Sequence, residues 1–373
     1  AALAFAWQAL TVRYNYNGNW TALFGAGALF TAPPEPLASE HIYQFPNSRG
    51  YDGQIFHIMA HDPFMLRGFW KTLDSPRYRY RRFLIPTLAW TLALGQDRFV
   101  DGAYISVILV FLFLGAYWLA ALAQLRGRSA LWALGLFAVP AVTVSLDRMT
   151  VDGCLIALIA GFVYYVQKQN WVLVFLMCAL CGLTRETGLL IPLGVTAWLL
   201  FERNLRRAIV MALSVMPTLL WFLYVSSRAP GKVGNRVSLI PFKGVVMRML
   251  SEHPYQFNAA INMAAMALDY LALAGIIVGV LYCQWSVRRL GSRADGWVAL
   301  FFAALVMLIA SPDVWRDAFS FARVFSPLLF LTALDGLFTE SLPGAVPILL
   351  TAPRIWLQFG FQVLGILRGV FGS

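Results

Sequence analysis

Residues 102–123, GAYISVILVFLFLGAYWLAALA, form an uninterrupted apolar run of the kind that crosses a lipid bilayer. A transmembrane helix needs about 20 mostly apolar residues to cross a hydrocarbon core of about 30 Å. Strands of membrane barrels are shorter and alternate apolar with polar residues, and this run does not alternate. The stretch therefore predicts a membrane-spanning helix and indicates an all-α fold.

The composition of the whole chain agrees with this prediction. Of its 373 residues, 60% are hydrophobic and 13% are charged, whereas soluble domains have about 45–50% apolar and about 25% charged residues. The other apolar runs predict spans at 130–146, 151–167, 171–184, 187–201, 208–225, 259–283, 296–311 and 318–337. With the end of a span at 1–12 and a last apolar stretch at 344–369, we expect a polytopic transmembrane helix bundle of about ten or eleven spans. The last stretch is interrupted at Pro347, Pro353 and Arg354.

We expect residues 1–373 to form a single domain with three parts. Residues 13–101 form a long first loop, 102–337 hold the core spans, and 338–373 form a C-terminal apolar segment. Within the loop, residues 83–95 are apolar but too short to span comfortably, which favours a helix lying at the membrane interface.

The net charge of +11 is explained by membrane topology. Lys and Arg gather in the cytoplasmic loops of membrane proteins. Short basic segments occur at alternate ends of the predicted spans, at 124–128, Lys168, 203–207 and 288–293. If these segments are cytoplasmic, the first loop lies on the non-cytoplasmic side. No soluble domain is left to bind nucleic acid, so the expected partners are membrane lipids.

The first loop contains Gly50-Tyr51-Asp52-Gly53-Gln54. Glycines on both sides of Asp52 allow a close approach of other backbone. A carboxylate at the membrane surface can act as a general base towards a hydroxyl group or hold a metal ion. The alternative is a turn aspartate that binds its own backbone. We include Gln54 among the polar groups of a candidate cavity.

Two histidines follow, His57 and His61, with the i, i+4 spacing that places them on one face of a helix. Together with Asp52 or Asp62 they could ligate a metal ion, although no Glu follows His57 as an H-E-x-x-H motif requires. The alternative is a polar helix face that lines a cavity. The Asp62-Pro63 pair is expected to end that helix. The identity of a metal stays open.

A cluster of arginines alternating with tyrosines comes next and includes Arg79, Arg81 and Arg82. Arginine binds phosphate oxygens in a bidentate manner. The cluster could therefore hold a lipid-linked phosphate, or it could anchor the loop to anionic headgroups. Near the C-terminal spans, Arg316 and Arg323 are seven residues apart, two turns along one face of a helix, and could reach the same phosphate from the other side.

Four further ionisable residues lie at the ends of apolar runs or interrupt them: Asp147, Asp152, Arg185 and Glu186. Ionisable groups at membrane depth are costly, and they are usually functional or paired with one another. We consider them polar groups of the candidate cavity, with local pairing as the structural alternative.

The order of these motifs along the chain resembles that of bacterial membrane glycosyltransferases of the GT-C superfamily, in particular the cell-surface glycopolymer or mannosyltransferase-like group. The resemblance covers most of residues 13–337. The segments that carry it are Tyr51-Asp52-Gly53-Gln54, Asp62-Pro63, Arg79–Arg82, Ser145–Asp152, Thr184–Thr187 and Arg323–Pro327.

The resemblance implies a GT-C-like transmembrane domain that transfers a sugar, with inversion, from a polyprenyl-phosphate donor to a glycan, lipid or protein acceptor. The reaction would take place on the non-cytoplasmic face of a bacterial inner membrane. Asp52 would be the general base, and Arg79, Arg81, Arg82, Arg316 and Arg323 would bind the donor phosphate. Some members use a divalent cation and others do not. Many carry a second acid in the first loop, for which Asp62 is the candidate.

Two other functions remain open. A GT-C-like chain can lose its reaction and serve as a structural or assembly subunit of a larger membrane complex. A transporter of lipid-linked sugars is the third hypothesis, but transporters often contain internal repeats, and this sequence shows none of fixed period.

Overall fold

The computed structural model describes residues 1–30, 34–35, 37–231, 234, 236–251, 255 and 258–371. About 75% of the chain is helical. Among the described residues, the named strands are β1 (Ala26–Gly27) and β2 (Gln44–Phe45), which pair in parallel. The prediction of an all-α fold is therefore confirmed apart from this short strand pair, and the fold is nearly all-α.

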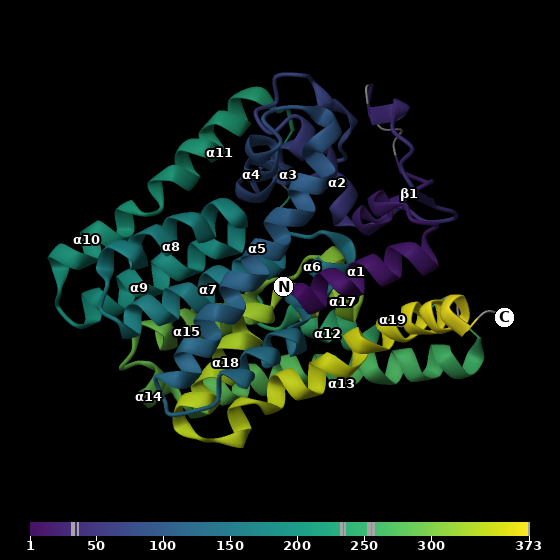
Figure 1. Cartoon of the computed structure of the whole chain (residues 1–373). Helices are drawn as coiled ribbons and strands as arrows, with labels where there is room; N and C mark the ends of the chain where they lie inside the picture. The colour runs from purple at the N-terminus through teal and green to yellow at the C-terminus, as the bar shows by residue number, and fades with distance from the viewer. Residues whose placement is uncertain are drawn as a thin grey trace.

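The N-terminal part consists of short elements. Its helices are α1 (Ala2–Asn15), η1 (Trp20–Phe24), η2 (Leu37–Ser39), α2 (Asp52–His61), η3 (Phe69–Thr72), α3 (Pro76–Arg79) and α4 (Leu84–Leu92). Helix α2 ends just before Asp62-Pro63, as expected, and α4 forms within the apolar residues 83–95. Helices α2, α3 and α4 gather at one end of the molecule (Figure 1).

The remainder is a helical bundle. Its elements are α5 (Asp97–Gln124), η4 (Ala130–Ala138), α6 (Pro140–Arg148), α7 (Asp152–Gln167), α8 (Trp171–Thr184), η5 (Glu186–Leu189), α9 (Leu190–Phe201), α10 (Leu205–Leu213), α11 (Met216–Arg228), α12 (Lys243–Leu250), α13 (Ala259–Trp285), α14 (Val287–Leu290), α15 (Ala294–Leu308), α16 (Pro312–Trp315), α17 (Ala318–Val324), α18 (Ser326–Thr339), η6 (Leu342–Gly344) and α19 (Val346–Phe371). Every apolar run predicted from residue 102 onward coincides with one or more of these helices.

Among the described residues, three segments are long and apolar enough to cross a membrane by themselves: Asp97–Gln124, Leu205–Arg228 and Ala259–Trp285. Two bent pairs, η4 with α6 (70°) and α17 with α18 (57°), raise the number to five if each pair is one span. The shorter apolar helices have 10–17 residues and reach at most about 26 Å at 1.5 Å per residue. These helices are compatible with an integral membrane protein, and their lengths allow three to five spans among the described residues, fewer than the ten or eleven predicted.

The C-terminal apolar stretch differs from its prediction, because α19 is one continuous helix with Pro353 inside it. Pro347 lies in the first turn, where a missing N–H group costs no helical hydrogen bond. Arg354 is buried and donates from Nε to Asp269 of α13 at 2.8 Å. A buried charge that is paired in this way does not interrupt a helix. Gly372 and Ser373 lie outside the described residues.

Helices α13 and α19 run side by side along the bundle (Figure 1). Their contact is close at Gly275, where an added Cβ would lie 2.6 Å from the carbonyl oxygen of Pro347. Asp269 of the same helix also accepts from Arg248 at 2.9 Å. The pair is thus held by close backbone packing at one point and by a buried charge network at another.

We predict that Gly275→Ala lowers the thermal stability of the protein in detergent, by about 1–3 kcal/mol, because a methyl group overpacks the α13–α19 contact. Gly102 in α5 is the matched control, since an added Cβ there meets nothing within 4 Å. Gly102→Ala should leave the melting temperature unchanged or raise it, as alanine favours a helix by about 1 kcal/mol. Equal melting temperatures for the two variants would contradict the close contact.

Candidate functional site: an arginine-lined cavity around Asp52

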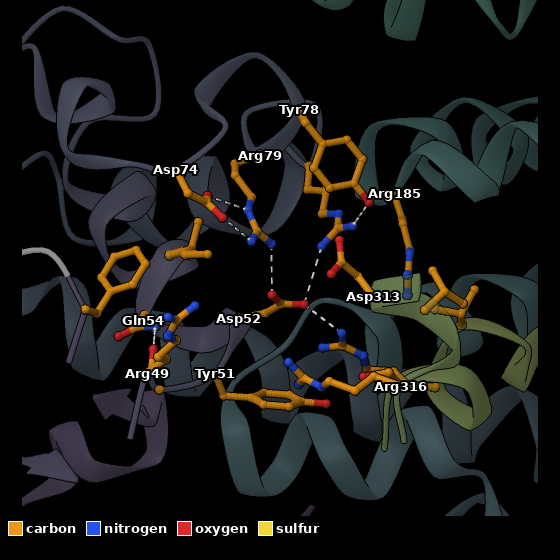
Figure 2. A pocket seen from close by; sticks show the side chains of 18 of the residues that line it. Arg49, Tyr51, Asp52, Gln54, Asp74, Tyr78, Arg79, Arg185, Asp313 and Arg316 are labelled. Carbon is orange, nitrogen blue, oxygen red and sulfur yellow. Dashed lines mark hydrogen bonds and ion pairs between the residues drawn. The ribbon is translucent and has the colours of Figure 1, made fainter. Parts of the chain in front are cut away.

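A polar cavity of about 460 Å³ opens where α2 and α3 face α16 and α17 (Figure 2). Its lining carries seven arginines and three aspartates, an excess of four positive charges. The arginines are Arg49, Arg79, Arg82, Arg185, Arg236, Arg316 and Arg323, and the acids are Asp52, Asp74 and Asp313. Asp52 lies at the centre of the labelled side chains in Figure 2.

Asp52 occupies this position because it begins α2, directly after the extended residue Tyr51. A carboxylate in the first turn is favoured by the positive end of the helix dipole. The next residue, Gly53, packs against other backbone, since an added Cβ would lie 2.6 Å from the carbonyl oxygen of Phe24. The glycine after Asp52 therefore serves close approach, as its sequence context indicated.

The Asp52 carboxylate contacts three arginines from two distant parts of the chain. Its Oδ1 accepts from Nη1 of Arg79 at 2.9 Å, and its Oδ2 accepts from Nη2 of Arg323 at 2.6 Å. Arg82 Nη1 lies 3.8 Å from the same Oδ2 atom. Asp52 is thus an ion-pairing residue of the cavity, and its side chain keeps 19% exposure.

Each of these arginines also contacts a second acid. Arg79 donates to both oxygens of Asp74, at 3.1 and 2.9 Å. Arg82 donates to both oxygens of Glu186, at 3.1 and 3.0 Å. These contacts fix the direction of each guanidinium group, so the donors that reach Asp52 are held in place before any ligand arrives.

The third arginine belongs to a buried network behind the cavity. Arg323 Nε lies 3.6 Å from Oδ2 of Asp152, which forms an ion pair with Arg185. Both members of that ion pair are almost fully buried. Asp152, Arg185 and Glu186 therefore support the cavity through its arginines, and of these three only Arg185 is part of its lining.

Electrostatics keep Asp52 ionised. Burial by itself would raise the pKa of its carboxyl group, but Arg323, Arg79 and Arg82 lower this pKa well below its usual range. A carboxylate held in this state is a weak proton acceptor as long as all three guanidinium groups point at it. Any anion that draws the arginines away would strengthen Asp52 as a base.

Four arginines line the cavity without contacting Asp52: the buried Arg185 described above, and Arg49, Arg236 and Arg316. Arg316 donates from Nε to Asp317 at 3.0 Å and its side chain is 63% exposed. The guanidinium of Arg236 lies 3.9 Å from the ring centre of Tyr78. Arg49 immediately precedes the Gly50–Gln54 segment. Their charge faces the same space as Arg79 and Arg323, which suits a ligand with more than one anionic oxygen.

The expected single helix face for Arg316 and Arg323 is not observed. Helix α16 ends at Trp315 and α17 begins at Ala318, because the side chain of Asp317 caps α17 by accepting from the Ser320 N–H group. The two arginines nevertheless line one cavity. Arg316 lies at the end of α16 and its side chain is 63% exposed. Arg323 lies in α17 and its side chain is 8% exposed.

Several residues predicted for the site lie elsewhere. Arg81 stacks on Phe222 at 4.6 Å. Asp62 is buried and accepts backbone N–H groups from the residues that follow α2, so its role is to fold that turn. Asp147 pairs with Gln362 and with Arg148. None of the three is among the cavity-lining residues.

His57 and His61 also lie outside the cavity, where they contact Asp101 and Asp97 of α5. Gln54, by contrast, lines the cavity and donates to the carbonyl oxygen of Arg49 at 2.8 Å. The histidines therefore form a separate cluster without Asp52 or Asp62.

Sequence reasoning did not select Arg49, Asp74 or Arg236 as site residues. For Arg49 a signal exists in its position just before the Gly50–Gln54 segment. Asp74 stands five residues before Arg79, a spacing that no helix rule singles out. Arg236 reaches the cavity from the connection between α11 and α12, and only tertiary folding brings it there.

No protein-family model matches this chain, and no curated protein or solved structure matches it significantly. The cavity therefore has to be interpreted from its own residues.

We predict that Asp52→Asn lowers stability by on the order of 2 kcal/mol, since three guanidinium groups, two of them buried, lose their shared anion. The pKa of Asp52 is lowered in the folded state, so its contribution is fully present above the unfolded pKa of about 3.9 and is lost as pH falls below it. The difference in melting temperature between wild type and variant should be constant from about pH 5 to 8 and shrink below about pH 4.

Glu202→Gln, at an exposed position outside the cavity, provides the control for a change of one charge. A difference between wild type and Asp52→Asn that varies strongly between pH 5 and 8 would show that Asp52 titrates there and would refute the lowered pKa.

Proposed function

We propose that this chain is an integral membrane glycosyltransferase of the GT-C type. It would move a sugar from a polyprenyl-phosphate donor to a glycan, lipid or protein acceptor on the non-cytoplasmic face of a bacterial inner membrane. The observation that carries the proposal is a cavity lined by seven arginines, three of which contact one partly exposed carboxylate, Asp52. The proposed reaction class, sugar transfer, comes from the resemblance of the motif order to that of GT-C glycosyltransferases.

The excess positive charge fits the phosphate end of the donor. Guanidinium groups bind phosphate oxygens with two parallel hydrogen bonds. Their effect grows during the reaction, because the leaving phosphate gains negative charge as its bond to the sugar breaks. A volume of about 460 Å³ also lies within the range of about 300–1,000 Å³ typical of ligand sites. The lipid tail would follow the apolar helices into the bilayer.

Asp52 would act as the general base. It takes the proton of the acceptor hydroxyl group while the hydroxyl oxygen attacks the anomeric carbon. The bond between that carbon and the phosphate oxygen breaks, and the polyprenyl phosphate leaves with the electron pair. Donor phosphate would compete with Asp52 for Arg79 and Arg323, and this competition would raise the proton affinity of Asp52 when the donor is bound.

A divalent cation fits this cavity poorly. Such an ion needs carboxylate oxygens that are free to bind it, whereas each oxygen of Asp52 contacts a guanidinium group. Arg79 also contacts both oxygens of Asp74. The arginines themselves can supply the charge that would stabilise the leaving phosphate.

One observation favours the second function, a non-catalytic structural or assembly subunit of a larger membrane complex, here one whose cavity binds a phosphate-headed lipid without transferring a sugar. The contacts with Arg323, Arg79 and Arg82 hold the pKa of Asp52 far below that of an efficient base, so in this arrangement the cavity is better suited to binding anions than to proton transfer. A lipid-linked sugar transporter is the third hypothesis and has no comparable support.

The test uses the full-length protein in lipid vesicles with a panel of polyprenyl-phosphate sugars and their acceptors. Asp52→Asn should reduce sugar transfer about 10²- to 10⁴-fold, the usual contribution of a general base, and should still bind polyprenyl phosphate. Arg323→Gln should weaken that binding about 10- to 100-fold, because it removes a charge-assisted hydrogen bond.

Arg81→Gln is the matched control, since Arg81 belongs to the same arginine cluster but stacks on Phe222 outside the cavity. It should retain wild-type transfer and binding. Normal transfer by a folded Asp52→Asn protein would eliminate Asp52 as the base. Binding of polyprenyl phosphate without transfer of any sugar by the wild type would favour the second function.

A further inference from the structure

A second cluster of ionisable side chains lies behind α2, away from the arginine-lined cavity. It consists of Glu40, His57, His61 and Asp101, and one ligand atom from each residue lies within 4.8 Å of the others. By the helical repeat of about 100° per residue, His57 and His61 lie about 140° and 180° around α2 from Asp52. One short helix therefore presents the cavity acid and this cluster in different directions.

The geometry of His61 indicates a ligand that is not a protein group. Its side chain is fully buried, and its Nε2 atom has no hydrogen-bond partner among the described residues. This atom lies 3.9 Å from Oδ1 of Asp101, which is also 2.6 Å from Nε2 of His57. A buried nitrogen without a partner is unfavourable, and here it lies beside a carboxylate that a neighbouring histidine already contacts.

The other ring nitrogen of His61 has a fixed role. Its Nδ1 lies 2.8 Å from Oδ1 of Asp97, and Arg67 donates to both oxygens of that aspartate, at 2.7 and 2.9 Å. Because Arg67 holds the Asp97 carboxylate in place, this carboxylate accepts a hydrogen bond from Nδ1–H of His61. The lone pair of Nε2 is then free to bind a metal ion. The same carboxylate–histidine arrangement orients the histidine ligands of metal sites.

We propose that His57, His61, Asp101 and Glu40 bind one divalent transition-metal ion, with Zn²⁺ as the best fit. Two imidazoles and two carboxylates form a four-ligand set that suits tetrahedral zinc. The ion replaces the proton between His57 and Asp101, and its two charges balance the two carboxylates. Ligand atoms around zinc are roughly 3.3–3.6 Å apart, so the widest separation in the cluster would shrink by about 1 Å. Nε2 of His57 and Oδ1 of Asp101, which are 2.6 Å apart, would separate by about 0.7 Å.

The site is structural in character. Its four ligands come from α2, from α5 and from the segment after η2, so a bound ion ties these three parts together behind the residue that begins α2. The 27% exposure of the Asp101 side chain leaves an access path for the ion. The proposal does not depend on the proposed glycosyltransferase reaction, since none of the four ligands lines the cavity.

The first test measures metal content and melting temperature of the full-length wild type in detergent. The chain stripped with a chelator and then dialysed against Zn²⁺ should retain about one zinc ion per chain. Zinc should also raise its melting temperature, because an ion that binds only the folded state stabilises it. Failure to retain zinc, or an unchanged melting temperature, would overturn the proposal. This test needs the wild-type protein only.

The second test compares variants. His61→Ala and Asp101→Asn should lose stoichiometric zinc and the zinc-dependent shift in melting temperature. Asp97→Asn, which changes the shared partner of His61 and Arg67 and no proposed metal ligand, should weaken zinc affinity about 10- to 100-fold. His41→Ala is the matched control, because His41 is exposed and outside the cluster, and it should keep wild-type zinc binding. A His61→Ala protein that retains zinc with wild-type affinity would also refute the site.

Discussion

One carboxylate shared by three guanidinium groups is the interaction on which the cavity depends. Unpaired charges are costly to remove from water, and Arg82 and Arg323 are both buried. Asp52 reduces their mutual repulsion, and each has a second acid nearby, Glu186 for Arg82 and Asp152 for Arg323. The result is a set of donors fixed in direction around one shared carboxylate, the arrangement that lets electrostatic groups act without reorganising.

The sequence predicted the helical class because apolar run length is a local property. It could not predict the number of complete spans, since bends such as the 70° angle between η4 and α6 depend on packing. The C-terminal helix was misjudged for a related reason. Pro353 and Arg354 interrupt a helix in isolation, but Asp269 and the α13 surface compensate for them in the folded chain.

The site was predictable in part, because closeness in sequence and a charge within an apolar run are also local properties. Asp52, Arg79 and Arg82 stand close together in sequence, and Arg323 stood out as a charge in an apolar region. Pairing partners were far less accessible to sequence reasoning. His57 and His61 had Asp52 and Asp62 as their nearest acids in sequence, yet they contact Asp97 and Asp101, because α2 turns that face towards α5. Short-range spacing reveals which residues share a face, but not what that face meets.

The separation of 271 residues between Asp52 and Arg323 has a consequence for how the chain is made. Asp52, Arg79 and Arg82 leave the ribosome long before α17 is synthesised. Until then the carboxylate lacks its third arginine, Arg323. The polar pocket can close only when nearly the whole chain has been inserted. Its assembly is therefore among the last events of biogenesis, and a chain interrupted before α17 would be left with an exposed acidic and basic surface.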